Sequence, residues 1–262
     1  MKHPLDLPLA APPRMAHNVS RETQTGGGHV HDEIVRALEA AHLTLEPERV
    51  RKLVEHAELV LEANRTMNLT RITDPSAVAT LHVVDSLYPL KLVGPLEGAV
   101  VDIGSGAGYP GIPISIVTDQ PVFLCESIKK KAAFLSRTVD ALGLECEVLP
   151  LRAEELAALR PRFAATVVAR AVSSLSALVE LSSPLLSDGG RLVALKAVPE
   201  QKEIEDAQQT ASMCGMMREA AYEYCLPLSG EARTVYTYVR SGDVRVRLPR
   251  RPGLAQKHPL VP

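Results

Sequence analysis

The stretch Ala-Val-Val-Asp-Ile-Gly-Ser-Gly-Ala-Gly-Tyr-Pro-Gly, residues 99–111, decides the fold of this chain. A short apolar run ends at Asp102, and glycines follow at alternate positions, Gly104, Gly106 and Gly108. An apolar run of this length predicts a buried strand. Glycines after a buried strand let the backbone approach a ligand more closely than side chains would allow. We therefore expect a ligand-binding loop at the carboxyl end of this strand.

Two cofactor classes compete for such a loop. Dinucleotides use the spacing G-x-G-x-x-G and place the pyrophosphate on a helix N-terminus. Here the spacing is G-x-G-x-G, and a carboxylate from Asp102 pointing into the loop would repel a pyrophosphate. S-adenosylmethionine (SAM) has no phosphate and carries an ammonium group that suits a carboxylate. A turn without a ligand needs fewer glycines. The pattern therefore favours SAM.

A second apolar run, Val122 to Glu126, ends in an acid 18 residues beyond Gly108. In nucleotide-binding α/β folds, an acid at this place accepts hydrogen bonds from ribose hydroxyls. The plain alternative is an exposed acid at a strand end. The distance from the glycine loop favours the ribose role for Glu126 and the following Ser127.

Composition excludes several classes of protein. The 262 residues carry a net charge of −2, so the whole chain is not a basic nucleic-acid binder. No apolar run approaches the roughly 20 residues of a membrane span, and prolines interrupt the N-terminal leucines, so we expect a cytoplasmic protein. The four cysteines show no C-x-x-C spacing, which argues against zinc and disulfides. We expect no metal ligand and a monomer.

Positive charge is nevertheless concentrated locally. The segment from Arg240 to residue 262 contains six cationic side chains and one acidic side chain, Asp243. The sequence Pro-Arg-Arg-Pro at 249–252 stiffens the chain around its arginines, which favours phosphate contacts over a solvated tail. For the triplet Lys129–Lys131 a solvated helix face is the preferred interpretation.

Strand and helix patterns alternate from residue 99 onward and predict a doubly wound, Rossmann-like α/β fold. We expect a mostly parallel seven-stranded sheet with an antiparallel last strand, of the type found in SAM-dependent methyltransferases. Before it, helical periodicity over 32–43, 47–64 and 74–92 predicts a small N-terminal helical cap. The expected units are a disordered leader (1–30), the helical cap (31–95), the SAM-dependent methyltransferase domain (96–240) and a basic C-terminal tail (241–262).

Ligands bind such sheets at the carboxyl ends of the strands. Strand three is followed by Arg152, Ala153 and Glu154, where an adenine edge is commonly held. Strands four and five end at Arg170 and Lys196. Either cation can orient a phosphate or the O6 of guanine, and the plain alternative is a solvated charge at a strand end.

Motifs that the sequence lacks exclude some classes of methyl acceptor. After strand four the chain reads Ala-Arg-Ala-Val at 169–172, not the D/N-P-P-Y/F turn of adenine amino methylation. No cysteine lies in a Pro-Cys turn, which argues against pyrimidine carbon-5 chemistry. A guanine N7 needs no proton removed, so alignment suffices. A small-molecule SAM methyltransferase, a nicotinamide dehydrogenase and a non-enzymatic RNA-binding protein remain as alternatives.

The chain resembles the bacterial 16S ribosomal RNA guanine-N7 methyltransferases, historically called glucose-inhibited division protein B. The matching segments run in family order over about residues 32–260, and they are Met67–Ile72, His82–Leu87, Val101–Pro113, Arg152–Glu154, Ala169–Val172, Gly189–Lys196 and Pro249–Gly253 with Lys257. The long N-terminal leader is not part of the family pattern.

The resemblance implies SAM-dependent N7 methylation of one guanine in a decoding-region loop of 16S rRNA, on the small ribosomal subunit. On sequence alone, His82 and Asp85 would satisfy a helix surface, and the resemblance instead places them at the RNA pocket. The expected catalytic residues are Arg170, Lys196, Asn68 and His82. The expected cofactor-binding residues are Asp102, Gly104, Gly106, Gly108, Tyr109, Glu126, Ser127, Ala153, Glu154 and Arg170, and the expected RNA-binding residues are Arg71, Asp85, Ser86, Arg250, Arg251 and Lys257.

Overall fold

The computed structural model describes residues 26–261. The first 25 residues of the predicted leader lie outside this range. Helix α1 spans Gly26–Ala40, so it begins inside the range predicted as leader and before the predicted helical start at residue 32. The predicted boundary at residue 30 is therefore too late.

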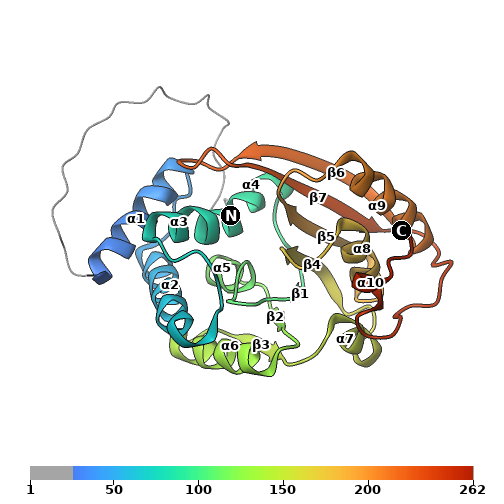
Figure 1. Cartoon of the computed structure of the whole chain (residues 1–262), viewed down its shortest axis with the longest axis horizontal. Helices are drawn as coiled ribbons and strands as arrows, with labels where there is room; N and C mark the ends of the chain where they lie inside the picture. The colour runs from blue at the N-terminus through green and yellow to red at the C-terminus, as the bar shows by residue number, and fades with distance from the viewer. Residues whose placement is uncertain (1–25, 262) are drawn as a thin grey trace.

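The centre of the fold is a seven-stranded sheet with the strand order β3-β2-β1-β4-β5-β7-β6 (Figure 1). Strand β7 runs antiparallel to both of its neighbours, and the strand pairs β3–β2, β2–β1, β1–β4 and β4–β5 are parallel. This confirms the predicted sheet. The strands are β1 (Val100–Ile103), β2 (Val122–Cys125), β3 (Cys146–Leu149), β4 (Ala164–Arg170), β5 (Leu186–Lys196), β6 (Met216–Cys225) and β7 (Ala232–Arg240).

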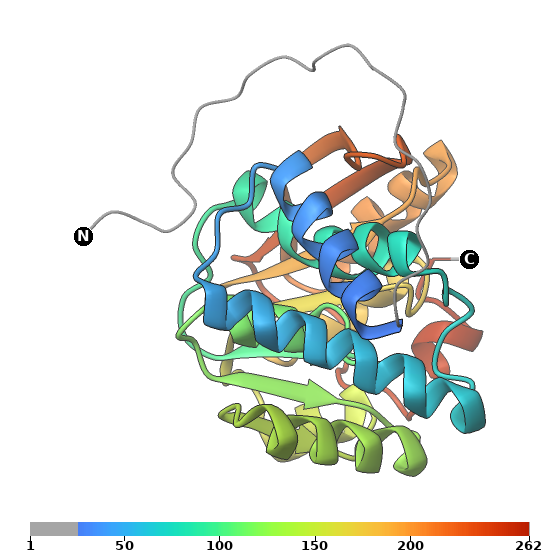
Figure 2. The same cartoon turned by 90° about the vertical axis from the view of Figure 1, so that its left-hand side faces the viewer.

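Helices cover both faces of the sheet (Figures 1 and 2). Neighbouring residues of one strand therefore enter different cores: Val100 packs with the helices α1–α6, and Val101 packs with α7–α10. All four residues of β1 are buried, which explains why three of them, Val100, Val101 and Ile103, are apolar. The later helices are α5 (Gly111–Val117), α6 (Lys129–Leu142), α7 (Ala153–Leu159), α8 (Leu175–Ser182), α9 (Gln201–Met213) and α10 (Leu254–Lys257).

The helical cap consists of α1, α2 (Pro47–Met67), α3 (Pro75–Val78) and α4 (Asp85–Val93). The helix start at residue 74 is as predicted, because the Asp74 carboxylate accepts a hydrogen bond from the backbone N–H of Ala77 at 3.0 Å. The predicted single helix over 74–92 is interrupted by a π-helical turn, Ala79–Val84, which ends with the N–H of Asp85 bonded to the carbonyl of Thr80. Such turns often occur at functional sites.

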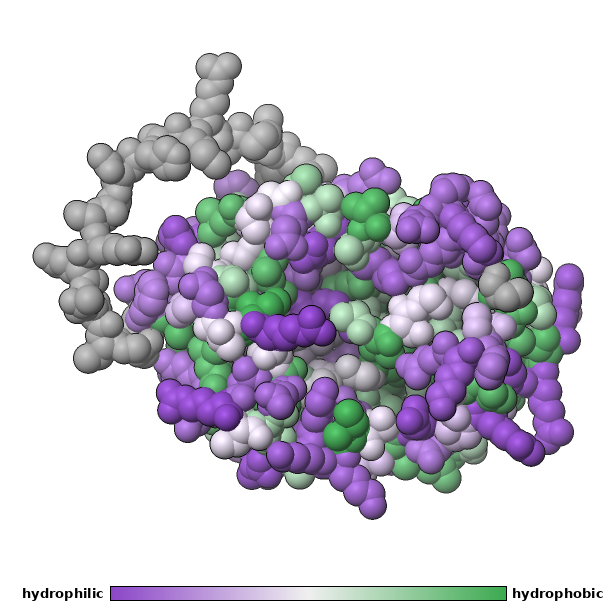
Figure 3. All heavy atoms as spheres, in the orientation of Figure 1, coloured by the Kyte–Doolittle hydropathy of each residue, from purple (hydrophilic) through white to green (hydrophobic). Residues whose placement is uncertain are grey.

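No helix within residues 26–261 is both long enough and apolar enough to cross a bilayer. On the face shown in Figure 3, hydrophilic residues predominate and the apolar ones lie in small separate groups.

Candidate functional site

The glycine loop joins the end of β1 to α5, and its first glycine is open to solvent. Gly104 has a φ of +73°, which favours glycine, and a Cβ there would lie 2.6 Å from Cγ2 of Val172. The hydroxyl of Ser105 donates to the carbonyl of Asp102 at 3.0 Å. The loop thus exposes backbone where any larger residue would force Val172 to move.

Asp102 lies beneath this loop and is fully buried. Its Oδ2 accepts a hydrogen bond from the N–H of Gly111 at 3.0 Å, while its Oδ1 is buried with no hydrogen-bond partner in the described part of the chain. Burial raises the pKa of this carboxyl to about 7. Asp102 therefore holds the two ends of the loop together and retains one free acceptor.

Glu126 holds the same loop from the end of β2. Its two carboxylate oxygens accept from the N–H of Gly106 at 3.0 Å and from the N–H of Ile128 at 2.7 Å. Each oxygen has a second lone pair, so these bonds leave capacity for ribose hydroxyls. Ser127, next in the chain, is exposed. Both residues lie at the mouth of the glycine loop.

A small cavity of about 70 Å³ lies between the ends of β1, β2 and β3. It is lined by Gly104, Ser127, Ala153 and Glu154, among others, and the C-terminal segment contributes Gln256. One oxygen of Glu154 accepts the N–H of Gly253 at 2.7 Å. The structure therefore brings these predicted residues together around one cavity, and it adds residues 253–256 at its border, which the sequence did not predict.

The donor and acceptor chemistry of these residues fits SAM. The exposed backbone at Gly104, the unpartnered buried Oδ1 of Asp102 and the carboxylates of Glu126 and Glu154 offer acceptors for ammonium, hydroxyl and amino groups. The residues around the small cavity include the cation Arg152 but no cluster of cations for a pyrophosphate.

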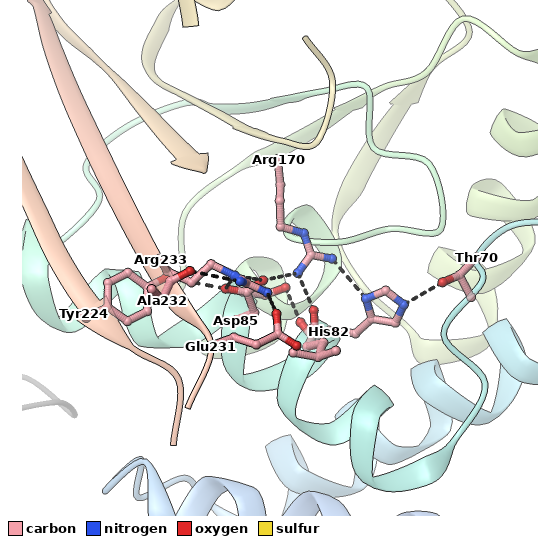
Figure 4. A network of polar contacts seen from close by, with 10 residues as sticks. Thr70, His82, Asp85, Arg170, Tyr224, Glu231, Ala232 and Arg233 are labelled. Atoms are coloured by element: carbon pink, nitrogen blue, oxygen red, sulfur yellow. Dashed lines mark hydrogen bonds and ion pairs between the residues drawn. The ribbon is translucent and has the colours of Figure 1, made fainter. Parts of the chain in front are cut away.

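A buried polar network lies at the ends of β4 and β7 (Figure 4). The guanidinium of Arg170 donates to the carbonyl of Leu81 at 2.9 Å and lies 3.4 Å from Oδ2 of Asp85. The same carboxylate accepts from Nε of Arg233 at 3.3 Å and from the hydroxyl of Tyr224 at 3.4 Å. Asp85 therefore neutralises arginines from two strands.

His82 continues this network from the π-helical turn. Arg170 donates to its Nδ1 at 3.3 Å, so Nδ1 accepts and Nε2 carries the proton that is shared with the hydroxyl of Thr70 at 2.9 Å. Burial and then the charge of Arg170 lower the pKa of His82 to about 3. His82 is therefore neutral across the physiological range.

Tyr109 lies between two histidine rings. The ring of His82 is stacked on it at 4.6 Å between centroids, and the ring of His56 lies tilted at 4.4 Å. The guanidinium of Arg170 is 5.6 Å from the centre of the same ring. The tyrosine thus connects the glycine loop to the polar network, and it is buried.

Beside the network is a cavity of about 590 Å³, within the range of roughly 300–1,000 Å³ typical of ligand pockets. Its charged lining is balanced, with three cations (Arg170, Lys196, Arg233) and three anions (Asp85, Glu203, Glu231). Lys196 forms an ion pair with Glu203 at 2.7 Å and donates to the carbonyl of Ser173 at 3.0 Å. The strand ends predicted to carry the chemistry, Arg170 and Lys196, thus meet in one cavity.

Sequence reasoning missed Glu203, Tyr224, Glu231, Arg233 and His56. These residues contact partners that are distant in the sequence. For Arg233, the only sequence feature that pointed to the site was its position at the start of the predicted last strand. Glu203 lay in a predicted helix, where an acid normally faces solvent.

The other expected RNA-facing residues divide into two groups. Asn68 caps the end of α2 with a φ of +51° and is exposed, as is Arg71. Ser86 is buried and donates to the carbonyl of His82 at 2.6 Å. Asp85 is buried within the arginine network described above. Both side chains are thus bonded within the fold, and their contact with RNA stays a prediction.

The basic tail is folded onto the domain. Arg250 pairs with the buried Glu180 of α8 through two hydrogen bonds of 2.7 and 2.6 Å. Its guanidinium therefore contributes to the fold, and its RNA role stays a prediction. Arg251 and Lys257 are exposed and make no ion pair within residues 26–261, so they remain available to phosphates.

The two neighbouring arginines are expected to respond oppositely to alanine. Arg250→Ala leaves the Glu180 carboxylate buried without its cation and should lower the free energy of unfolding by about 3 kcal/mol. Arg251→Ala should leave stability within about 0.5 kcal/mol and weaken salt-dependent RNA binding. Urea unfolding and RNA titrations at several salt concentrations measure both. Equal stability of the two variants would contradict the assignment of Arg250 to the fold.

Stability is expected to fall as pH drops from about 6.5 to 5. The pKa of buried His56 is lowered to about 4 and that of His82 to about 3, so only the unfolded chain protonates them in this window. Asp102 partly offsets this loss of stability, because its pKa is raised to about 7 and the folded state therefore binds one proton there that the unfolded chain does not. In the variant His56→Gln, the number of protons that the chain takes up on unfolding in this pH window should be smaller by about one. If the free energy of unfolding of His56→Gln changes with pH as steeply as that of the unaltered protein, His56 does not contribute in this way.

Comparisons with known proteins agree with this geometry. Residues 49–226 match the model of the family described as GidB, rRNA small subunit methyltransferase G. The chain belongs to this family. A ribosomal RNA small subunit methyltransferase G from Pelotomaculum thermopropionicum is 37% identical over 225 residues, covering 83% of this chain and 93% of the relative. Its counterpart in Carboxydothermus hydrogenoformans is 33% identical over 222 residues, covering 83% and 94%.

A solved structure supports the fold. The YcgJ protein of Bacillus subtilis superimposes with a TM-score of 0.50 at 12% identity, covering 62% of this chain and all of that protein. The family match includes the glycine loop, Asp85 and Arg170 but ends before Glu231, Arg233 and the C-terminal segment. Within residues 26–261, no group of three or more histidine, cysteine or acidic side chains is arranged to hold a metal ion.

Proposed function

We propose that the protein transfers a methyl group from SAM to N7 of a specific guanine in 16S ribosomal RNA. The observation that carries this proposal is the charge-balanced cavity at the ends of β4 and β5, in which the two side chains that contact Arg170, His82 and Asp85, are not free to accept a proton. His82 is neutral with a lowered pKa, and Asp85 is occupied by two arginines. Family membership supports the same reaction. We further propose that the protein works as a cytoplasmic monomer.

The cofactor-binding residues follow the ends of the first three strands. In this proposal the backbone at Gly104, Gly106 and Gly108 and the free acceptor of Asp102 receive the amino acid end, with Asp102 also holding the loop. Glu126 and Ser127 bind the ribose, and Ala153 with Glu154 borders the adenine. Tyr109 and Arg170 separate this site from the acceptor cavity. When bound, SAM supplies an electrophilic methyl group on a positive sulfonium.

The chain contributes alignment and charge balance. The N7 lone pair of guanine forms the new bond to the methyl carbon as the carbon–sulfur bond breaks, and the positive charge passes to the purine. No proton moves, so no general base is required. Lys196 has three N–H donors and uses two, on Glu203 and Ser173, which leaves one for the guanine O6. Cys125 is no nucleophile, because burial raises its pKa to about 12.

The RNA approaches over exposed residues around the cavity. Asn68 and Arg71 lie at the end of the helical cap, and Arg251 with Lys257 lies on the C-terminal segment. The three cations among them, Arg71, Arg251 and Lys257, supply phosphate contacts that hold the small-subunit RNA in register.

Labelled methyl transfer tests the proposal. Purified protein is incubated with methyl-labelled SAM and small ribosomal subunits, or naked 16S rRNA, from a strain lacking the modification. Strand cleavage specific for N7-methylguanine then locates the product. We expect label at one guanine. Label in a small molecule or protein, with none in RNA, would overturn the proposal.

A further inference from the structure

Glu231 lies in the turn between β6 and β7 and lines the large cavity together with Arg170. In the sheet, β5 separates the start of β7 from the end of β4. Glu231 is therefore on the side of the cavity away from the glycine loop, which follows β1 on the other side of β4. Figure 4 shows its carboxylate beside Arg233 at the edge of the polar network.

Glu231 is the most exposed of the three cavity acids, and it has an unused acceptor. Its Oε2 pairs with Nη2 of Arg233 at 2.8 Å, its Oε1 makes no hydrogen bond in the described residues, and its side chain is 46% exposed. By contrast, Asp85 accepts from two arginines and Tyr224. Oε1 of Glu203 accepts from the N–H of Leu175 at 2.8 Å and also pairs with Lys196, and although its Oε2 makes no hydrogen bond in the described residues, its side chain is only 25% exposed. An incoming donor therefore meets Glu231 first.

A guanine placed for this reaction presents two donors on that side. When N7 points toward the glycine loop, the N1–H and the N2 amino group lie on the far side of the purine. A carboxylate accepts from both, and adenine, cytosine and uracil do not offer this pair of donors. We propose that Glu231 is the specificity-determining residue that reads the Watson–Crick edge of the acceptor guanine. This inference rests on the proposed function and adds the recognition of the base.

The same contact favours methyl transfer. Positive charge that arrives on the purine makes N1–H a stronger donor, so its hydrogen bond to a carboxylate strengthens as the new bond forms. An interaction that is stronger in the transition state than in the ground state raises the rate of the chemical step. Glu231 would therefore act on the rate as well as on base selection.

Inosine provides the test, because it keeps N7, O6 and N1–H but lacks the N2 amino group. Small subunits are reconstituted with 16S rRNA that carries guanosine or inosine at the acceptor position, and kcat/KM is measured for each with saturating SAM. We expect the unaltered protein to prefer guanosine by about 10- to 100-fold, the size of a good base-edge contact. Glu231→Ala should reduce this preference to about 3-fold or less, mainly by slowing the reaction of guanosine.

A control on the same hairpin separates recognition from structure. Glu223 is exposed on β6 and does not line the large cavity, so Glu223→Ala should keep the full guanosine preference. If Glu231 only positions Arg233, then Glu231→Ala slows guanosine and inosine equally and the preference survives, which would overturn the inference. If the unaltered protein methylates neither RNA, the proposed function itself fails.

Discussion

Asp85→Asn is expected to lower the free energy of unfolding by about 3–5 kcal/mol. The carboxylate is 6% exposed and lies between the guanidinium groups of Arg170 and Arg233, which are 14% and 16% exposed. Without it, two positive charges face each other across a buried site with no compensating anion except Glu231 at the edge. Breaking a buried ion cluster by removing one partner leaves charge that is neither paired nor hydrated.

Urea denaturation followed by circular dichroism measures this change. Asp119→Asn is the matched control, since that aspartate is 94% exposed although it also contacts an arginine, and its loss should cost less than about 1 kcal/mol. If the two variants lose the same stability, the cluster around Asp85 does not hold the hairpin of β6 and β7 to the helical cap as described.

Arg170→Lys is expected to reduce kcat/KM for RNA methylation by at least about 100-fold. The planar guanidinium contacts the carbonyl of Leu81, Nδ1 of His82 and the Asp85 carboxylate at once, and an ammonium cannot reproduce that fork. Misplacing reacting groups by about 1 Å can cost a factor of about 100 in rate. The positive charge itself is kept, so the buried carboxylate remains paired and the variant should fold.

Single-turnover methylation of small subunits, together with SAM titration by calorimetry, distinguishes alignment from cofactor binding. Arg65→Lys on the exposed surface of α2 serves as the control and should react normally. A rate for Arg170→Lys within 3-fold of the unaltered protein would show that the guanidinium does not align the reaction.

Much of the fold was predictable because its signals are local. The run Val100–Ile103 has apolar residues on both faces and only Asp102 among them is polar, so it specifies a central parallel strand, and the glycines that follow specify a loop open to a ligand. The cap at Asp74 was readable for the same reason. The π-helical turn was not, because the wider hydrogen bonding at Ala79–Val84 has no distinct residue pattern.

The sequence by itself determined the sheet, the glycine loop and the acids at its strand ends, since these depend on residues next to one another in the chain. Only the tertiary structure decided which charges pair. Arg233 lies 148 positions from Asp85, and Arg250 lies 70 positions from Glu180, separations at which residue spacing carries no information. Burial distinguishes two neighbouring arginines: Arg250 pairs with a buried acid, while Arg251 beside it is exposed.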